Sequence, residues 1–321
     1  MSRFLARRIA LGVLVMWLVT LAVFLIFFIG PGPGAVARAL AGRQATQAQV
    51  ALIAHRLLLD RPIFVQYGHF LNGLVHGNLG YDYYYSQSVN SIIGAAFPIT
   101  FSLVVGAAVL WLAMGVLTGV VSAVRTRSVY DRTFTTLALF FYSMPTFVLG
   151  LMLLLLLYYE LTIHGIHAFP GSGYTAITAN PFQWLRGLVL PWITLALVQA
   201  ATYTRLSRGS MLDVLGEDYI RTARAKGLSE RRVVFRHALR AALTPVVTQF
   251  GIDIGVLLGG VIITEVVFGM PGLGYTAFQA ISRQDLPVII GIVIVASAAV
   301  VAANIVVDAL YAVLDPRVRV H

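Results

Sequence analysis

Six apolar segments, each close to the length that crosses a lipid bilayer, dominate this chain of 321 residues. They are residues 9–29, 99–124, 134–159, 188–203, 246–268 and 286–314. A helix of about 20 apolar residues spans the hydrocarbon core and satisfies its own backbone hydrogen bonds there. Only 11% of the residues are charged, whereas soluble domains carry about 25%. The sequence therefore predicts an all-α, polytopic membrane protein, with six transmembrane helices in one domain over residues 1–321.

Positive charge is distributed unevenly among the segments that flank these spans. Alternate segments, 1–8, 125–133, 204–245 and 315–321, hold 17 of the 23 Lys and Arg residues, and the others hold six. Cytoplasmic segments close to membrane spans are enriched in Lys and Arg. We therefore expect both termini in the cytoplasm. This bias also explains most of the formal net charge of +10, so we expect no nucleic-acid partner.

The segment 30–98 is the largest one that this topology places on the extracytoplasmic side. Residues 47–59 have the apolar spacing of a short amphipathic helix, and residues 64–75 follow as a second helix. An aromatic cluster comes next: Tyr81, Tyr83, Tyr84 and Tyr85. Two interpretations stay open for this region. It rests on the lipid headgroups, where Tyr is favoured, or it docks an extracytoplasmic partner.

The chain lacks the residue patterns of common catalytic and nucleotide-binding sites. It has no cysteine, and its only lysine, Lys226, precedes Gly227, whereas a P-loop needs Gly-Lys-Ser/Thr. His164 and His167 lie three apart, and we interpret them as surface residues rather than metal ligands. We therefore predict no catalytic residue, no metal site and no Walker-type binding of ATP by this chain.

Asp253 and Glu265 are carboxylates at or near membrane depth, where an uncompensated charge is costly. Gly251, Gly255 and Gly259 recur every four residues around Asp253 and predict a face on which another helix packs closely. Asp253 projects nearly opposite that face. Two interpretations of Asp253 stay open: it lines a translocation path, or it makes a structural hydrogen bond to Ser, Thr or Asn on another helix. For Glu265 we predict a place on the translocation path.

A second glycine pair has the same spacing. Gly115 and Gly119 lie in the predicted second span, four residues apart and so on one helix face. They are a further indication of close helix packing.

The segment 204–245 holds nine of the 23 Lys and Arg residues between two predicted spans. Gly227 is expected to end a first short helix, and a second one carries an arginine stripe and an apolar stripe: Arg232, Arg236 and Arg240; Val234, Ala238 and Ala242. Pro245 is expected in the first turn of the fifth span. Physical chemistry leaves two roles open, a positive face on anionic lipid or a docking element for a cytosolic protein.

This segment resembles the coupling loop, or EAA loop, of ABC importer permeases. The matching residues are Ala223-x-x-x-Gly227 and the run His237-Ala-Leu-Arg-Ala-Ala-Leu-Thr-Pro245. Arg221 stands where the family usually has Glu, a departure that the peptide and nickel branch shares in the pattern Arg-Thr-Ala-x-Ala-Lys-Gly.

Further motifs along nearly the whole chain resemble the same branch. They are Arg3-Phe-Leu-Ala-Arg-Arg8, Leu59-Asp-Arg-Pro62 with Gln66-Tyr67, Gly77-Asn-Leu-Gly80, Tyr142-Ser-Met-Pro145, Thr264-Glu-Val-Val-Phe268, Pro271-Gly-Leu-Gly274 and Val307-Asp-Ala-Leu-Tyr-Ala-Val-Leu-Asp-Pro-Arg317. The family's usual Pro-Gly-Asp-Pro after the first span is Gly30-Pro-Gly-Pro-Gly34 here, so any role of that Asp does not carry over.

The resemblance implies a B-type permease subunit of an oligopeptide or dipeptide ABC importer, with the type I permease fold, in the inner membrane of a prokaryote. The implied partners are a similar C-type permease, two cytosolic ATP-binding cassette subunits that hold ATP and magnesium, and an extracytoplasmic substrate-binding protein. Relatives also handle nickel, haem, glutathione or glycosides, and a proton-coupled secondary transporter is a further alternative. The implied contacts to the ATPase are Arg221, Thr222, Ala223, Arg224, Lys226, Gly227, Leu228 and Ser229.

Overall fold

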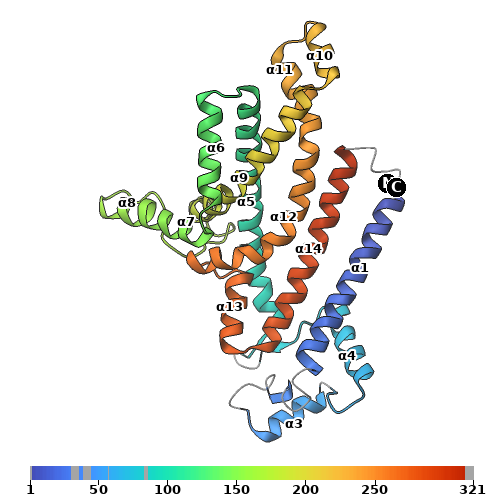
Figure 1. The fold of residues 1–321 in the computed structure, drawn as a ribbon. Helices are drawn as coiled ribbons and strands as arrows, with labels where there is room; N and C mark the ends of the chain where they lie inside the picture. The colour runs from blue at the N-terminus through green and yellow to red at the C-terminus, as the bar shows by residue number, and fades with distance from the viewer. Residues whose placement is uncertain (1, 30–35, 39–44, 57, 83–85, 315–321) are drawn as a thin grey trace. The chain divides into compact units, whose positions relative to one another are not determined.

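The computed structural model describes residues 2–29, 36–38, 45–56, 58–82 and 86–314, without the side chains of 2–4, 254–256, 258–260 and 310–314. The chain forms two compact units, and Figure 1 draws the elements of both. The first unit comprises Met1–Thr100 and Pro271–Ile305, and the second unit comprises Phe101–Met270 and Val306–His321. Two long helices, α5 (Val89–Val124) and α14 (Leu286–Leu314), contribute to both units.

The first unit begins with a long apolar helix and continues with short helices and one small hairpin. Its elements are α1 (Ser2–Phe24), the π-helical turn η1 (Leu25–Ile29), α3 (Gln47–Arg56), α4 (Ile63–Val75), β1 (Tyr81–Asp82), β2 (Gln87–Ser88) and α13 (Leu273–Arg283). The two strands pair antiparallel, with Tyr81 opposite Ser88. The helices predicted over 47–59 and 64–75 are confirmed as α3 and α4, although α3 already ends at Arg56.

The start of α3 is fixed by a capping box. The Thr46 backbone N–H donates to the Gln49 side-chain oxygen over 2.8 Å, and the Gln49 N–H donates to the Thr46 hydroxyl over 3.3 Å. Each contact satisfies a donor that the first turn of a helix leaves free.

Aromatic rings join α1 and α4 within the first unit. Phe24 is buried, and its ring centroid lies 5.2 Å from that of Phe28, 5.1 Å from Tyr67 and 5.9 Å from Phe70. The hydroxyl groups of Tyr67 and Thr20 lie 3.0 Å apart. Aromatic pairs at such distances contribute about 0.5–1.5 kcal/mol beyond their buried area. The segment after the first span is therefore packed against it.

The second unit is built from long and short helices, with an irregular connection over residues 164–180. Beside the rest of α5, its elements are α6 (Val129–Tyr142), α7 (Thr146–Leu153), η2 (Leu154–Tyr159), α8 (Glu160–Ile163), α9 (Pro181–Leu215), α10 (Asp218–Ala225), α11 (Glu230–Arg232), η3 (Val233–Ala238) and α12 (Leu239–Val267). Helix α9 lies between α6 and α12 and packs on both. It begins where the Asn180 side chain accepts hydrogen bonds from the backbone N–H groups of Phe182 and Gln183.

Glycines bring α5 and α9 into close contact, and we call this line of contact the α5–α9 seam. A Cβ atom added at Gly115 would lie 2.3 Å from Cβ of Tyr203, and one at Gly119 would lie 2.6 Å from Cβ of Ser207. The hydroxyl groups of Thr118 and Thr204 lie 2.7 Å apart beside them. The seam therefore admits no larger residue at either glycine, as expected for small residues at a helix interface.

The glycine ladder in α12 is seen in part. A Cβ atom at Gly251 would lie 2.8 Å from a Val307 methyl carbon of α14, so this glycine lies at a close helix contact. Gly255 and Gly259 fall outside the described side chains, and their packing role stays a prediction.

The third predicted span, residues 134–159, is wrong as one continuous helix. The chain breaks between α6 and α7 at Ser143–Pro145, and Pro145 caps α7. Proline has no N–H and disfavours helical geometry in the residue before it, here Met144. Helix α6 has 14 residues, about 21 Å at 1.5 Å per residue, which is shorter than the hydrocarbon core.

The sequence predicts Pro245 in the first turn of the fifth span, and this prediction is wrong. The proline lies inside α12, which continues from η3 without a break, so the predicted second short helix is part of the helix that contains span five. The fourth predicted span, residues 188–203, is also only the middle of α9. In a long helix the neighbouring side chains and helices satisfy the carbonyl that an internal proline leaves free.

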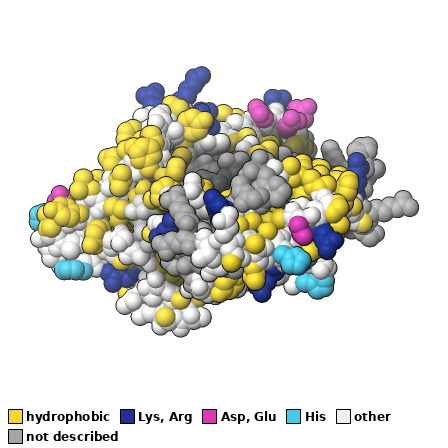
Figure 2. All heavy atoms as spheres, turned by 90° about the horizontal axis from the view of Figure 1, so that it is seen from below, with side chains coloured by type: hydrophobic (Ala, Val, Ile, Leu, Met, Phe, Trp, Pro, Cys, Tyr) yellow, Lys and Arg dark blue, Asp and Glu magenta, His cyan; other side chains and the backbone are white. Residues whose placement is uncertain are grey.

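Five helical stretches among the described residues are long and apolar enough to cross a membrane: Leu5–Ile29, Val89–Val124, Thr146–Ile163, Pro181–Leu215 and Leu286–Ala309. The predicted span 246–268 lies mostly in α12, the middle of which includes side chains that are not described. Figure 2 shows broad exposed apolar patches with only scattered charged and histidine side chains. Large exposed apolar surfaces mark contact with membrane or protein.

Candidate coupling site

Helix α10 and the turn after it contain most of the residues implied in coupling. The helix has an acidic residue in its first turn, Asp218, and a basic one in its last, Arg224, which complements the helix dipole. Ile220 and Ala223 are buried against the rest of the second unit, and the residues between them face outward. Within the second unit, α10 and α11 project at the end of α9 and α12 (Figure 1).

Gly227 ends α10 in a turn that few other residues adopt. Its φ is +75°, and its N–H donates to the Arg224 carbonyl over 2.9 Å. The next N–H, of Leu228, donates to the Ala223 carbonyl over 3.3 Å. This pair of bonds defines a Schellman motif, in which glycine avoids the steric cost of a left-handed residue. The predicted helix break at Gly227 is confirmed.

An ion pair closes the turn between α10 and α11. Arg224 donates from Nε to one Glu230 carboxylate oxygen over 3.1 Å and from a terminal nitrogen to the other over 2.7 Å. The Arg224 hydrogen bond lowers the pKa of Glu230. Both side chains are exposed, so the pair contributes little to stability and mainly holds the geometry of the turn.

An apolar cluster beneath α10 ties it to three long helices. It joins Val120 and Ala123 of α5, Met211 of α9, Ile220 and Ala223 of α10, Val233, Val234 and Ala238 of η3, and Ala242 of α12. The predicted apolar stripe of Val234, Ala238 and Ala242 is therefore buried in this cluster. Because packed interiors are nearly incompressible, a displacement of α10 is passed to the ends of these helices.

The eight residues implied in coupling divide into two groups. Those with exposed side chains or backbone are Arg221, Thr222, Arg224, Lys226, Gly227 and Ser229. Ala223 is buried and Leu228 is half-buried, and both pack on the cluster beneath α10. The first group forms a surface that a partner can touch, and the second group attaches that surface to the chain.

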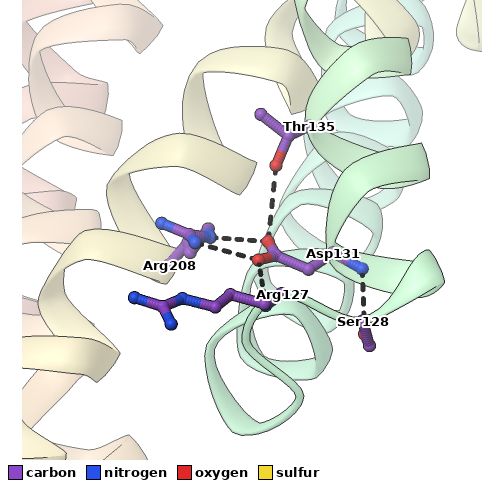
Figure 3. A network of polar contacts seen from close by, with 5 residues as sticks. All are labelled: Arg127, Ser128, Asp131, Thr135 and Arg208. Carbon is purple, nitrogen blue, oxygen red and sulfur yellow. Dashed lines mark hydrogen bonds and ion pairs between the residues drawn. The ribbon is translucent and has the colours of Figure 1, made fainter.

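A buried ion pair, which was not among the predicted site residues, braces the same end of the second unit (Figure 3). Arg208 of α9 donates from Nε and from a terminal nitrogen to the two carboxylate oxygens of Asp131 in α6, over 2.7 and 3.0 Å. The Arg127 backbone N–H and the Thr135 hydroxyl also donate to this carboxylate, over 3.0 and 3.5 Å. We call this set the Asp131–Arg208 brace. The two residues are 77 apart, and no spacing pattern links them in the sequence.

The brace favours the ionised form of Asp131. Its side chain is 8% exposed, and a buried carboxyl without partners would resist ionisation. The Arg208 guanidinium outweighs this effect and lowers the pKa of Asp131 to about 2. The carboxylate is therefore charged and paired at any physiological pH.

Two family descriptions together match almost the whole chain. Residues 1–104 match the N-terminal part of the binding-protein-dependent transport system membrane component, and residues 115–320 match the binding-protein-dependent transport system inner membrane component. The chain belongs to this family. It is a non-catalytic, multi-pass permease subunit of the inner membrane, as the sequence analysis predicted.

Curated relatives align with this chain over nearly its whole length. The permease is 38% identical over 319 residues to the putative peptide transport system permease protein of Brucella abortus (strain 2308), with 99% of both chains covered. It is 37% identical over 337 residues to the di/tripeptide transport system permease protein of Pseudomonas aeruginosa (strain UCBPP-PA14), and 37% over 338 residues to the dipeptide transport system permease protein of Escherichia coli (strain K12). Each alignment covers 99% of both chains.

A solved structure supports the fold alone. The permease is similar to a chain of the inward-facing MetNI methionine ABC transporter, with a TM-score of 0.53 at 18% identity. The similarity covers 70% of this chain and 96% of that chain. The predicted type I ABC importer permease fold is confirmed.

Asp253 of the permease has a partner on another helix. The Tyr203 hydroxyl of α9 donates to one carboxylate oxygen over 2.8 Å, and the Gln249 amide donates to the other over 2.9 Å. This is the structural hydrogen bond of the second interpretation, made by Tyr rather than by Ser, Thr or Asn. A role of Asp253 in lining the translocation path stays a prediction.

Glu265 of the permease is fully buried near the end of α12. The Met270 N–H donates to its backbone carbonyl over 2.8 Å, and Gly269 adopts a φ of +59° in the turn between them. Its place on the path also stays a prediction. Among the described residues, no three His, Asp or Glu side chains gather in a metal-binding arrangement.

Proposed function

We propose that this permease imports peptides, driven by ATP that partner subunits hydrolyse. The observation that carries the proposal is its 37–38% identity to relatives named as peptide, di/tripeptide and dipeptide transport system permeases, over 99% of their length. Similarity over that length includes the spans as well as the segment around α10. The chain supplies one half of the translocation path, and a similar C-type permease supplies the other half.

Two cytosolic ATP-binding cassette subunits and an extracytoplasmic substrate-binding protein complete the importer. The family description, binding-protein-dependent transport, supports the extracytoplasmic substrate-binding protein as a partner. The sequence supports the ATP-binding cassette subunits, because its only lysine, Lys226, is followed by Gly227, whereas the lysine of a P-loop is followed by Ser or Thr. ATP and magnesium therefore bind to the partner subunits, and no cofactor binds to this chain.

The exposed surface of α10 receives the movement of the ATPase. Thr222 and Lys226 lie on this surface, while Ile220 and Ala223 anchor the helix on the opposite side. When the ATPase dimer closes on ATP, it shifts α10, and the apolar cluster passes the shift to α5, α9 and α12. The spans then open toward the binding protein. We expect α10 and both termini to lie in the cytoplasm, because the positive charges favour that orientation.

Reconstitution of the assembled importer in proteoliposomes tests the proposal. A Thr222→Trp substitution adds bulk to the proposed docking surface, and Val129→Trp adds the same bulk at a position in α6 that is 78% exposed. We expect Thr222→Trp to abolish ATP-driven uptake of a labelled dipeptide and to abolish ATP hydrolysis stimulated by the binding protein. We expect Val129→Trp to preserve both.

Three results would point elsewhere. Full activity of Thr222→Trp would show that α10 is not the coupling element. Uptake of nickel, haem, glutathione or a glycoside instead of the dipeptide by the unsubstituted importer would change the substrate. Uptake by the chain alone under a proton gradient would identify a secondary transporter.

A further inference from the structure

A groove of about 310 Å³ lies in the second unit beside the turn between α10 and α11, which we call the coupling turn. One wall is the last turn of α5 with Arg125 after it, and the other wall is formed by α11 and η3. The walls are mainly apolar and include Val121, Val124 and Phe235, which are 37, 41 and 55% exposed. The groove is therefore open to a ligand that carries an apolar part.

The apolar wall continues along α5 away from the groove. Every fourth residue of this helix has an exposed side chain that is apolar: Phe101, Val105, Val109, Ala113, Leu117 and Val121. Residues four apart are neighbours on a helix surface, so these side chains form one continuous apolar row that winds slowly round α5, and its last members lie nearly opposite the glycines of the seam. An acyl chain lying along this face ends at the groove.

Two arginines line the end of the groove that follows the apolar span. The Arg125 guanidinium stacks 5.1 Å from the ring centroid of Tyr130, and Arg231 projects from α11. Among the described residues, neither arginine forms an ion pair. Glu230 also lines the groove, but its carboxylate is taken by Arg224. The groove therefore offers two cationic groups to an anion.

The position of the groove along α5 indicates where that anion lies. Arg125 follows directly on a span of 36 residues with a high mean hydropathy, so the guanidinium lies where hydrocarbon gives way to water. Tyr130 beside it is a residue type enriched at this interface. Apolar walls that lead to two arginines at the interface match a lipid with an anionic headgroup.

We propose that this groove binds an anionic phospholipid, with an acyl chain against Val121 and Phe235 and the phosphate group between Arg125 and Arg231. The inference goes beyond peptide import and does not depend on it. Because Glu230 both lines the groove and pairs with Arg224, the bound lipid lies directly beside the coupling turn.

Native mass spectrometry of the purified full chain with equal amounts of phosphatidylglycerol and phosphatidylcholine tests the proposal. The test variant is Arg125→Gln/Arg231→Gln. The matched control is Arg132→Gln/Arg232→Gln, which removes the same charge from two exposed arginines that do not line the groove. We expect the unsubstituted chain and the control to prefer phosphatidylglycerol. We expect the test variant to lose about 30-fold in preference, from about fivefold per arginine.

A third variant separates the groove from general surface charge. Val121→Trp fills the groove without changing charge, and we expect it to weaken phosphatidylglycerol binding while the gel-filtration profile stays unchanged. Each single arginine variant should lose part of the preference.

The proposal is overturned if the test and control variants lose preference equally, since the attraction would then be diffuse. It is also overturned if the unsubstituted chain shows no preference, or if Val121→Trp binds the lipid normally. Loss of bound lipid when the ATPase subunits assemble would also overturn the proposal for the importer, because a protein would then occupy the groove.

Discussion

The α5–α9 seam and helix α10 belong to one compact unit but are built in opposite ways. At the seam, Gly115 and Gly119 leave no room for a Cβ atom, so the two helices move together. At α10, Thr222, Arg224 and Lys226 are exposed, and the helix is held by the apolar cluster beneath it and by the exposed Arg224–Glu230 pair. The difference matches the two requirements of the coupling that we propose. A close-packed part carries a displacement, and an exposed part receives it.

The largest effect is expected at the seam. In Gly119→Leu, the new side chain meets Cβ of Ser207 and the carbonyl of Thr204, 2.6 and 2.7 Å from its own Cβ position. We expect a loss of at least about 3 kcal/mol in unfolding free energy, because neither helix can give way without breaking other contacts. Yield and thermal unfolding in detergent measure it.

A control for this substitution lies on α9. Gly209 has nothing within 4 Å of its Cβ position, so Gly209→Leu should be tolerated. Equal damage by both leucines would mean that the seam is not specially tight.

The next largest effect is expected at the Asp131–Arg208 brace. Asp131→Asn leaves the Arg208 charge without its partner, and Arg208 is only 32% exposed. We expect a loss of about 2–3 kcal/mol, less than for a fully buried pair because Arg208 retains some water. Asp218→Asn breaks the exposed pair with Arg221 and should change stability by less than about 0.5 kcal/mol. Chemical unfolding of both variants is the measurement.

The brace also has a pH dependence of known sign. The pKa of Asp131 is lowered in the folded chain to about 2, so the folded state binds this proton more weakly than the unfolded state. The stabilisation is complete above the ordinary Asp pKa and is lost as the pH falls from about 4 toward 2. The difference in stability between the unsubstituted chain and Asp131→Asn should shrink over that window. A constant difference would contradict the pairing.

A smaller effect on stability, with a larger one on coupling, is expected at Gly227. A β-branched residue at φ +75° is strained, so Gly227→Val should cost about 1–3 kcal/mol locally and misplace the end of α10. Asn tolerates this conformation, so Gly227→Asn should restore coupling. ATP hydrolysis stimulated by the binding protein is the readout. If valine and asparagine behave alike, the left-handed turn is not what coupling requires.

The smallest effect is expected in the first unit, where Asp285 has the opposite environment to Asp131 but is only half-buried, so that solvent screens its interactions. Burial and the charge of the buried Asp82 raise the pKa of Asp285 to about 6. The folded state then binds this proton more tightly than the unfolded state, so stability rises as the pH falls from about 6 to 4. Asp285→Asn should be more stable than the unsubstituted chain at pH 7 and should lose this dependence. Unfolding midpoints at pH 4 to 7 check it.

The sequence predicted most of the helices because apolar length and helix-breaking residues are local properties. It placed α3, α4 and the break at Gly227 correctly. It predicted the third span as one helix through Pro145, because the apolar residues continue on both sides of this proline. The proline nevertheless ends one helix and begins the next. The prediction misplaced Pro245 because a proline inside a long packed helix and one at a helix start look alike in sequence.

The candidate site was predicted less completely, because its support depends on contacts between distant residues. The exposed residues of α10 were named from a contiguous motif. The Asp131–Arg208 brace joins two helices across 77 residues, and only the fold brings them together. The partner of Asp253 was expected among Ser, Thr and Asn, but the fold places Tyr203 beside it.

The most direct test of the central claim uses the absence of native cysteines, which allows a single one to be labelled. Ala225→Cys places a thiol on the exposed end of α10, and Ser282→Cys places one at an exposed position of α13. Both are treated with a membrane-impermeant maleimide in inside-out vesicles, with and without the ATPase subunits. We predict that Ala225→Cys is labelled without the ATPase and protected when it binds, while Ser282→Cys is not labelled in either state. Labelling of Ala225→Cys that the bound ATPase leaves unchanged would contradict α10 as the coupling element.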